Sequence, residues 1–202
     1  MIYVKYKMDL EDVFSICAAR RFIIGDESKL KLVSENWDGS EASDSDVIIG
    51  INANGKGIIG YYEDDCYISS TTEIINKFAK PEEKIALIDL ALFIDFRKNQ
   101  NLNDYMKTVL DGCEDNEGME SLKRIDLAAV FEAARAILER PDEVIAFMEV
   151  IFEGLLKKGL EKIELVQSKK TGAGLSELYR DLQEAGVIPK MSPVTLPKKD
   201  KS

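Results

Sequence analysis

The sequence contains no histidine among its 202 residues. This absence excludes Ser-His-Asp and Cys-His catalysis, zinc sites with histidine ligands and any histidine general base. Catalysis would have to rest on other side chains or on an oxygen-bound cation such as Mg²⁺. No complete catalytic, cofactor or metal-binding motif takes that place. The sequence therefore favours a non-catalytic protein without deciding the point, and it assigns no catalytic residue, no cofactor and no metal ion.

Long apolar runs are also absent. No stretch of about 18 apolar residues could cross a bilayer, and Met1 to Lys7 alternates apolar and polar side chains, unlike the apolar core of a signal peptide. Cysteine is scarce, and Cys17, Cys66 and Cys113 are widely separated, which favours free thiols in a reducing compartment. The sequence therefore predicts a cytoplasmic protein without a membrane partner.

Basic side chains are the minority charge. The chain has 27 Lys and Arg against 37 Asp and Glu, and a formal net charge of −10. An acidic body repels the phosphate backbone at long range, so nucleic acid is disfavoured as a partner. The same charge would attract a basic protein, although it could also serve solubility alone.

The N-terminal part of the chain predicts strands with one helix among them. Asp9 is a helix cap, and a helix is expected over residues 9–21. Residues 22–33 predict a hairpin. Asn54-Gly55, between two apolar runs, is the strongest short-range hairpin signature, because both turn residues must take positive φ. We therefore predict an α+β fold whose residues 1–70 form an antiparallel β-meander with this early helix.

The rest of the chain has helical periodicity. Residues 71–188 are expected to form a helical region packed on or beside the sheet. Within it, Pro81 is expected to open a helix that continues as an apolar helix over 84–96. A helix from Pro141 is expected to stop at Gly159 and to be followed by a strand over 160–166. The proline- and lysine-rich residues 189–202 predict a disordered basic tail.

Two short segments suggest nucleotide binding. Gly50 to Gly57 fits the first seven places of G-x-x-x-x-G-K-[ST], and Ser168 to Leu178 resembles the guanine-contacting segment of small GTPases. The resemblance implies a nucleotide-binding protein, with Gly55, Lys56, Ser168 and Lys169 at the nucleotide. However, Gly57 replaces the required Ser or Thr, and the residues after it predict a strand where a phosphate loop opens a helix. The Asn54-Gly55 hairpin explains the same residues, so nucleotide binding is an alternative hypothesis.

A basic segment near the C-terminus gives a second alternative. Residues 175–189 are similar to the recognition helix of winged-helix DNA-binding proteins, and Lys169, Lys170, Arg180 and Lys190 make the surroundings basic. The resemblance implies a nucleic-acid reader. An ordinary amphipathic terminal helix would explain the same residues.

The favoured hypothesis is a non-catalytic protein–protein interaction module, an adaptor or an inhibitor with an acidic surface. Its candidate contact residues are Trp37, Glu63, Asp64 and Asp65. A lone tryptophan beside an acidic loop can anchor a partner, although it more often covers the edge of its own core. The expected partner is a protein with a basic surface, and the sequence predicts no oligomeric state.

Overall fold

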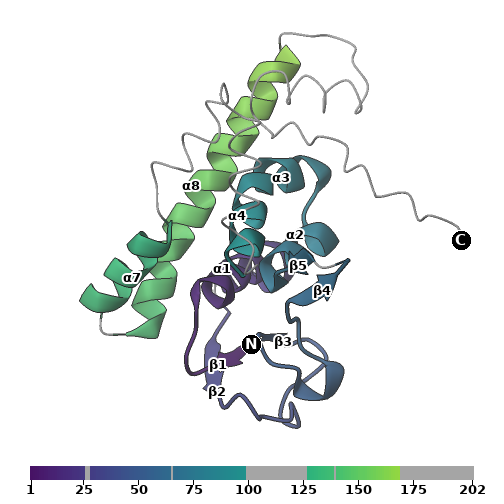
Figure 1. Cartoon of the computed structure of the whole chain (residues 1–202), viewed down its shortest axis with the longest axis vertical. Coiled ribbons are helices and arrows are strands. Elements are labelled where there is room, and N and C mark those ends of the chain that lie inside the picture. Colours follow the sequence, from purple (N-terminus) through teal and green to yellow (C-terminus); the bar gives the residue numbers. More distant parts are fainter. Residues whose placement is uncertain (26–27, 65, 99–126, 139, 169–202) are drawn as a thin grey trace, which may run out of the picture.

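The computed structural model describes residues 1–25, 28–64, 66–98, 127–138 and 140–168 (Figure 1). Its strands are β1 (Ile2–Lys5), β2 (Leu30–Val33), β3 (Val47–Ile49), β4 (Tyr61–Glu63) and β5 (Cys66–Ile68). Its α-helices are α1 (Leu10–Ala19), α2 (Ser70–Phe78), α3 (Pro81–Ala86), α4 (Ile88–Lys98), α7 (Leu127–Ile137) and α8 (Pro141–Ser168). In these residues every strand precedes residue 70 and helices dominate afterwards, so the α+β class is confirmed.

β1 is the centre of a three-stranded sheet in the order β2-β1-β3, and it runs parallel to both neighbours. Ile2 lies opposite Leu30 on one side and opposite Val47 on the other. The predicted antiparallel meander is wrong for these strands, because α1 provides the crossover that parallel pairing needs. Parallel strands are covered on both faces, and Ile2, Tyr3 and Val4 are all buried.

The Asn54-Gly55 turn forms, but the hairpin predicted around it does not. Asn54 and Gly55 have φ values of 57° and 82°, as expected for a turn of this kind. The chain after the turn returns to β3 in the parallel sense, through a bridge between Ile49 and Ile58. Antiparallel pairing occurs one turn later, where β4 and β5 form a hairpin with Tyr61 opposite Ile68.

The early helix is confirmed, and the strand predicted after it is not. Asp9 caps α1, and Asp9 and Asp12 form a reciprocal capping box. Residues 22–24 extend the helix as part of a π-helical turn, Arg20–Ile24. The Phe22 ring meets Phe152 of α8 edge-on at 6.2 Å between centroids. Packing against α8 therefore overrides the strand preference of this apolar segment.

The two faces of the parallel sheet are covered differently. Ile2, Val4 and Ile49 pack with the helices in the main core. Tyr3 and Ile48 face the other way and belong to a second cluster, which is closed by the loop after β2. Ala42, in the acidic segment 38–46 of this loop, packs against the cluster.

The apolar helix predicted over 84–96 is interrupted at one residue. α3 ends at Ala86 and α4 begins at Ile88, because Leu87 leaves the helical conformation at φ −103° and ψ 5°. Pro81 begins α3, as predicted for a proline at the first helical position. Leu87, Leu90 and Ile94 are buried in the main core, so the segment is central to it.

α8 is a continuous helix of 28 residues, so the predicted stop at Gly159 and strand over 160–166 are wrong. A Cβ atom at Gly159 would lie 2.5 Å from the Ala86 carbonyl oxygen. Glycine is present there because the backbone of α3 packs directly against α8, and not because the helix ends.

The main core includes residues from both sides of the boundary predicted near residue 70. Ile2 and Val4 of β1 share it with Phe152 and Leu156 of α8. α1 lies between the sheet and the other helices and contacts both α2 and α8 (Figure 1). The predicted tail, 189–202, lies outside the described residues.

Candidate functional site

The β4–β5 hairpin carries two exposed aromatic side chains. Tyr61 is 44% and Tyr62 is 64% exposed. The antiparallel register places Tyr62 opposite Tyr67, and their rings meet edge-on with centroids 5.2 Å apart. Because side chains alternate along a strand, Tyr61 and Glu63 project from the other side of the hairpin. Tyrosine is enriched where proteins bind one another.

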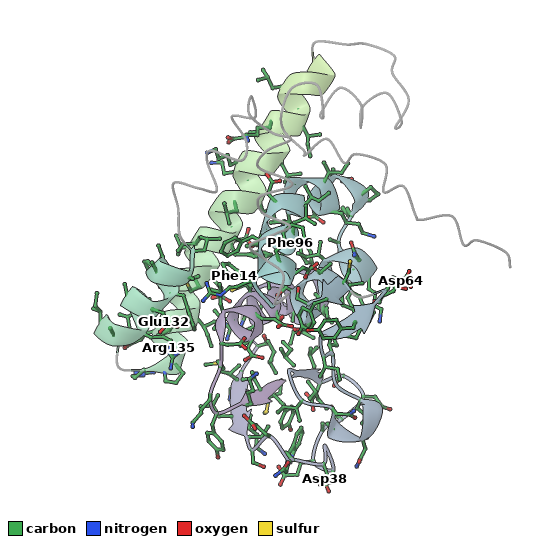
Figure 2. The ribbon with its side chains drawn as sticks, in the orientation of Figure 1. Phe14, Asp38, Asp64, Phe96, Glu132 and Arg135 are labelled. Atoms are coloured by element: carbon green, nitrogen blue, oxygen red, sulfur yellow. The ribbon has the colours of Figure 1, made fainter. Side chains whose placement is uncertain are left out.

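Acidic side chains lie at the tip of the same hairpin. Glu63 and Asp64 are exposed, and Figure 2 shows Asp64 at the outer end of the hairpin, directed away from the body of the molecule. Asp64 has a φ of 47°, the left-handed conformation that aspartate tolerates in a tight turn. Within the described residues neither carboxylate forms an ion pair. Asp65, the third acid predicted here, lies outside these residues.

Trp37 does not join this hairpin. Its ring stacks on Tyr3 with centroids 4.5 Å apart and an interplanar angle of 13°. It is half-buried and, with Ala42, covers the second cluster of the sheet. The structure therefore gives Trp37 contacts within its own fold, while Glu63 and Asp64 stand with the exposed tyrosines.

A buried polar network lies behind the hairpin. The Glu11 carboxylate, on α1, accepts hydrogen bonds from the Tyr67 hydroxyl and from both the backbone N–H and the hydroxyl of Ser70. The hydroxyl of Ser15 lies 2.8 Å from that of Ser70 and 2.9 Å from that of Thr71. Each buried polar group in this set has a partner, as a stable interior requires.

A second carboxylate holds the start of α2. Asp95 of α4 accepts hydrogen bonds of 2.8 Å from the Ser69 backbone N–H and from the Thr72 hydroxyl. Burial raises the pKa of Asp95 above its ordinary value, and the hydrogen bonds from Ser69 and Thr72 oppose the rise. Negative groups at a helix N-terminus are favourable, so Glu11 and Asp95 fix α2 between α1 and α4.

Charged groups also meet at the carboxyl ends of the parallel strands. Lys5, at the end of β1, lies 2.9 Å from Asp12 and 3.8 Å from Asp9. Burial, and then the charge of Asp9, raise the pKa of Asp12 to about 6. The chain passes from β1 to β2 on one side and then to β3 on the other side of β1. Open parallel sheets bind ligands where the strand order reverses in this way. Here, however, the capping box already uses the Asp9 and Asp12 amides, and two carboxylates repel a phosphate.

Among the described residues, Gly55 and Lys56 do not form a phosphate loop. Gly55 ends a 3-10 turn, Lys56 is exposed, and Ile58 pairs with the edge of β3. No helix begins directly after Lys56, where the chain is non-helical up to β4, so backbone amides do not converge there as phosphate binding requires. Ser168 is the last residue of α8, and Lys169 lies outside the described residues, as do Lys170, Arg180 and Lys190.

The described part of the chain contains acidic side chains and thiols, the groups that could bind a metal ion or act as nucleophiles. No group of three or more Cys, Asp or Glu side chains in it is arranged to hold a metal ion. Burial raises the pKa of the Cys17 thiol well above its ordinary value, and Cys66 is an exposed free thiol. Across the described ranges, no helix is long and apolar enough to cross a membrane.

Sequence patterns miss the network behind the hairpin. Glu11 and Tyr67 are 56 residues apart, and no motif links them. The only local signal was Ser69 before a run of polar residues, which is typical of a helix N-terminus.

No protein-family model matches the chain, and neither a curated protein nor a solved structure is significantly similar to it.

Proposed function

We propose that this protein is a non-catalytic protein–protein interaction module that binds a basic partner through the β4–β5 hairpin. The observation that carries the proposal is the exposure of Tyr61 and Tyr62 directly beside the exposed carboxylates of Glu63 and Asp64. Aromatic side chains supply contact area at low entropic cost, and unpaired carboxylates supply charge complementarity.

The overall charge supports the same class of partner. With a net charge of −10, the protein attracts basic surfaces at long range and repels phosphate backbones. The free thiols Cys17 and Cys66 fit a reducing compartment, and we place the protein in the cytoplasm. Attraction between opposite charges accelerates association, and it weakens as salt screens the charges.

The proposal is tested with two variants of equal charge. Glu63→Gln with Asp64→Asn removes two carboxylates from the hairpin. Glu35→Gln with Glu143→Gln removes two exposed carboxylates from elsewhere on the surface. Each immobilised protein is incubated with native extract at low and high salt. Captured proteins are identified by mass spectrometry, and binding is then measured with the purified partner.

We expect wild type and the Glu35/Glu143 variant to bind the same basic protein at low salt, and the Glu63/Asp64 variant to bind it about tenfold or more weakly. Binding that falls equally in the two variants would reflect net charge alone and would contradict a role for the hairpin. Failure of wild type to retain any basic protein at low salt would remove the proposal.

A further inference from the structure

One buried carboxylate joins the hairpin to the body of the molecule. The Tyr67 hydroxyl of β5 lies 3.1 and 3.0 Å from the two carboxylate oxygens of Glu11, which is buried on α1. Oε1 of the same carboxylate also lies 2.9 Å from the backbone nitrogen and from the hydroxyl oxygen of Ser70, at the start of α2. Glu11 therefore fixes the strand β5 and the helix that follows it to the same point on α1.

The segment that enters the hairpin packs against this hydrogen bond. A Cβ atom at Gly60 would lie 2.0 Å from the Tyr67 hydroxyl oxygen and 2.9 Å from a carboxylate oxygen of Glu11. A side chain at Gly60 would thus separate the two groups. The Tyr62 ring rests against the Tyr67 ring, so the orientation of Tyr67 also orients one of the exposed tyrosines.

We propose that Glu11 and Tyr67 are positioning residues, which hold the β4–β5 hairpin in the orientation that its basic partner binds; this inference rests on the proposed function. A hairpin with three-residue strands is not stable by itself in water. Without the contact to α1 it would sample several orientations. A partner would then have to immobilise it, and the cost of that ordering lowers affinity.

The test uses Tyr67→Phe, which removes the hydroxyl and keeps the ring. Tyr6→Phe is the matched control, because the Tyr6 side chain is exposed and lies outside the hairpin. Amide hydrogen exchange is followed by NMR at individual residues of β4 and β5. Binding of a fluorescent octalysine peptide, a defined basic probe, is measured at low salt by anisotropy.

In Tyr67→Phe we expect hairpin amides to exchange about tenfold faster, as loss of a hydrogen bond to a carboxylate implies. Octalysine should bind about threefold or more weakly, while Tyr6→Phe changes neither quantity. Gly60→Ala, which crowds the same hydrogen bond, should reproduce both effects.

Unchanged hairpin exchange in Tyr67→Phe and Gly60→Ala would overturn the inference. So would faster exchange with unchanged octalysine affinity, because the contact would then not influence binding. If wild-type protein binds no octalysine, or binds it equally after Glu63→Gln with Asp64→Asn, the proposed function fails and this inference falls with it. Failure of the proposed function is distinguishable from failure of this inference, because it appears in the binding of wild type or of the Glu63/Asp64 variant, whatever the exchange data show.

Discussion

At the scale of single residues, the contacts of Trp37 favour a structural role over a binding role. It stacks on Tyr3 at 4.5 Å between ring centroids and closes the second cluster of the sheet. An exposed tryptophan anchor would instead contribute to a partner's interface and little to its own fold. The same residue type beside an acidic loop is compatible with either role, and only the contacts decide between them.

Trp37→Ala should therefore lower stability and leave partner binding unchanged. Loss of a half-buried aromatic ring and its stack is expected to cost about 1–3 kcal/mol in the free energy of unfolding. Denaturant unfolding followed by circular dichroism gives the stability change, and octalysine anisotropy at low salt gives the binding. Reduced octalysine affinity in a variant that remains folded would place Trp37 in the contact surface after all.

At the scale of elements, α8 contains two glycines in different surroundings. A Cβ atom at Gly159 would lie 2.5 Å from the Ala86 carbonyl oxygen, whereas one at Gly154 would meet nothing within 4 Å. Alanine favours a helix over glycine by about 1 kcal/mol. The two positions therefore allow helix propensity and helix packing to be measured separately in one helix.

Gly154→Ala should stabilise the protein by about 0.5–1 kcal/mol, because only the propensity changes. Gly159→Ala should destabilise it by about 1–3 kcal/mol, because the methyl group forces α8 away from α3. Thermal and denaturant unfolding of both variants provide the comparison. Equal stabilisation by the two substitutions would show that α3 and α8 are not in close backbone contact.

The elements that sequence predicts well are those specified by neighbouring residues. Asp9 as a cap, Pro81 as a first helical residue and the positive φ of Asn54 and Gly55 all depend on local backbone chemistry. The parallel pairing of β1 and the continuation of α8 through Gly159 depend on distant contacts, so local patterns gave the wrong answer for both.

In the candidate site, Glu63 and Asp64 could be found as acids in a turn. Their link to Glu11 through Tyr67 could not, because nothing in the spacing marks it.

At the scale of the whole molecule, buried and partly buried carboxyl groups set an unusual dependence of stability on pH. Burial raises the pKa of Asp89 to about 6, against the opposing charge of Lys162, and it also raises the pKa of Asp12 to about 6. A carboxyl group whose pKa is higher in the folded state binds protons more tightly there. The contribution of these groups to stability is then largest at low pH and falls as the pH rises from about 4 to about 6.

Other carboxyl groups act in the opposite direction, at lower pH. The hydrogen bond from Arg140 holds the pKa of Asp142 below its ordinary value. A carboxyl group of this kind contributes stability above its unfolded pKa, and that contribution is lost as the pH falls below about 4. The two groups of carboxylates therefore predict a maximum of stability near pH 4, because one contribution falls above this pH and the other is lost below it.

Asp89→Asn isolates the contribution of the Asp89 carboxyl group to the pH dependence of stability, because the amide cannot ionise. We expect the variant to be more stable than wild type at pH 7.5 by about 1–2 kcal/mol, and its melting temperature to rise less than that of wild type between pH 7.5 and pH 5. Asp142→Asn, at an exposed position, is the control and should leave the slope in this interval unchanged. Melting curves recorded by calorimetry across the interval decide the matter. If Asp89→Asn were less stable than wild type at pH 7.5, the attraction of Lys162 would outweigh the cost of burying the charge, and the acidic maximum would have to arise from Asp12 alone.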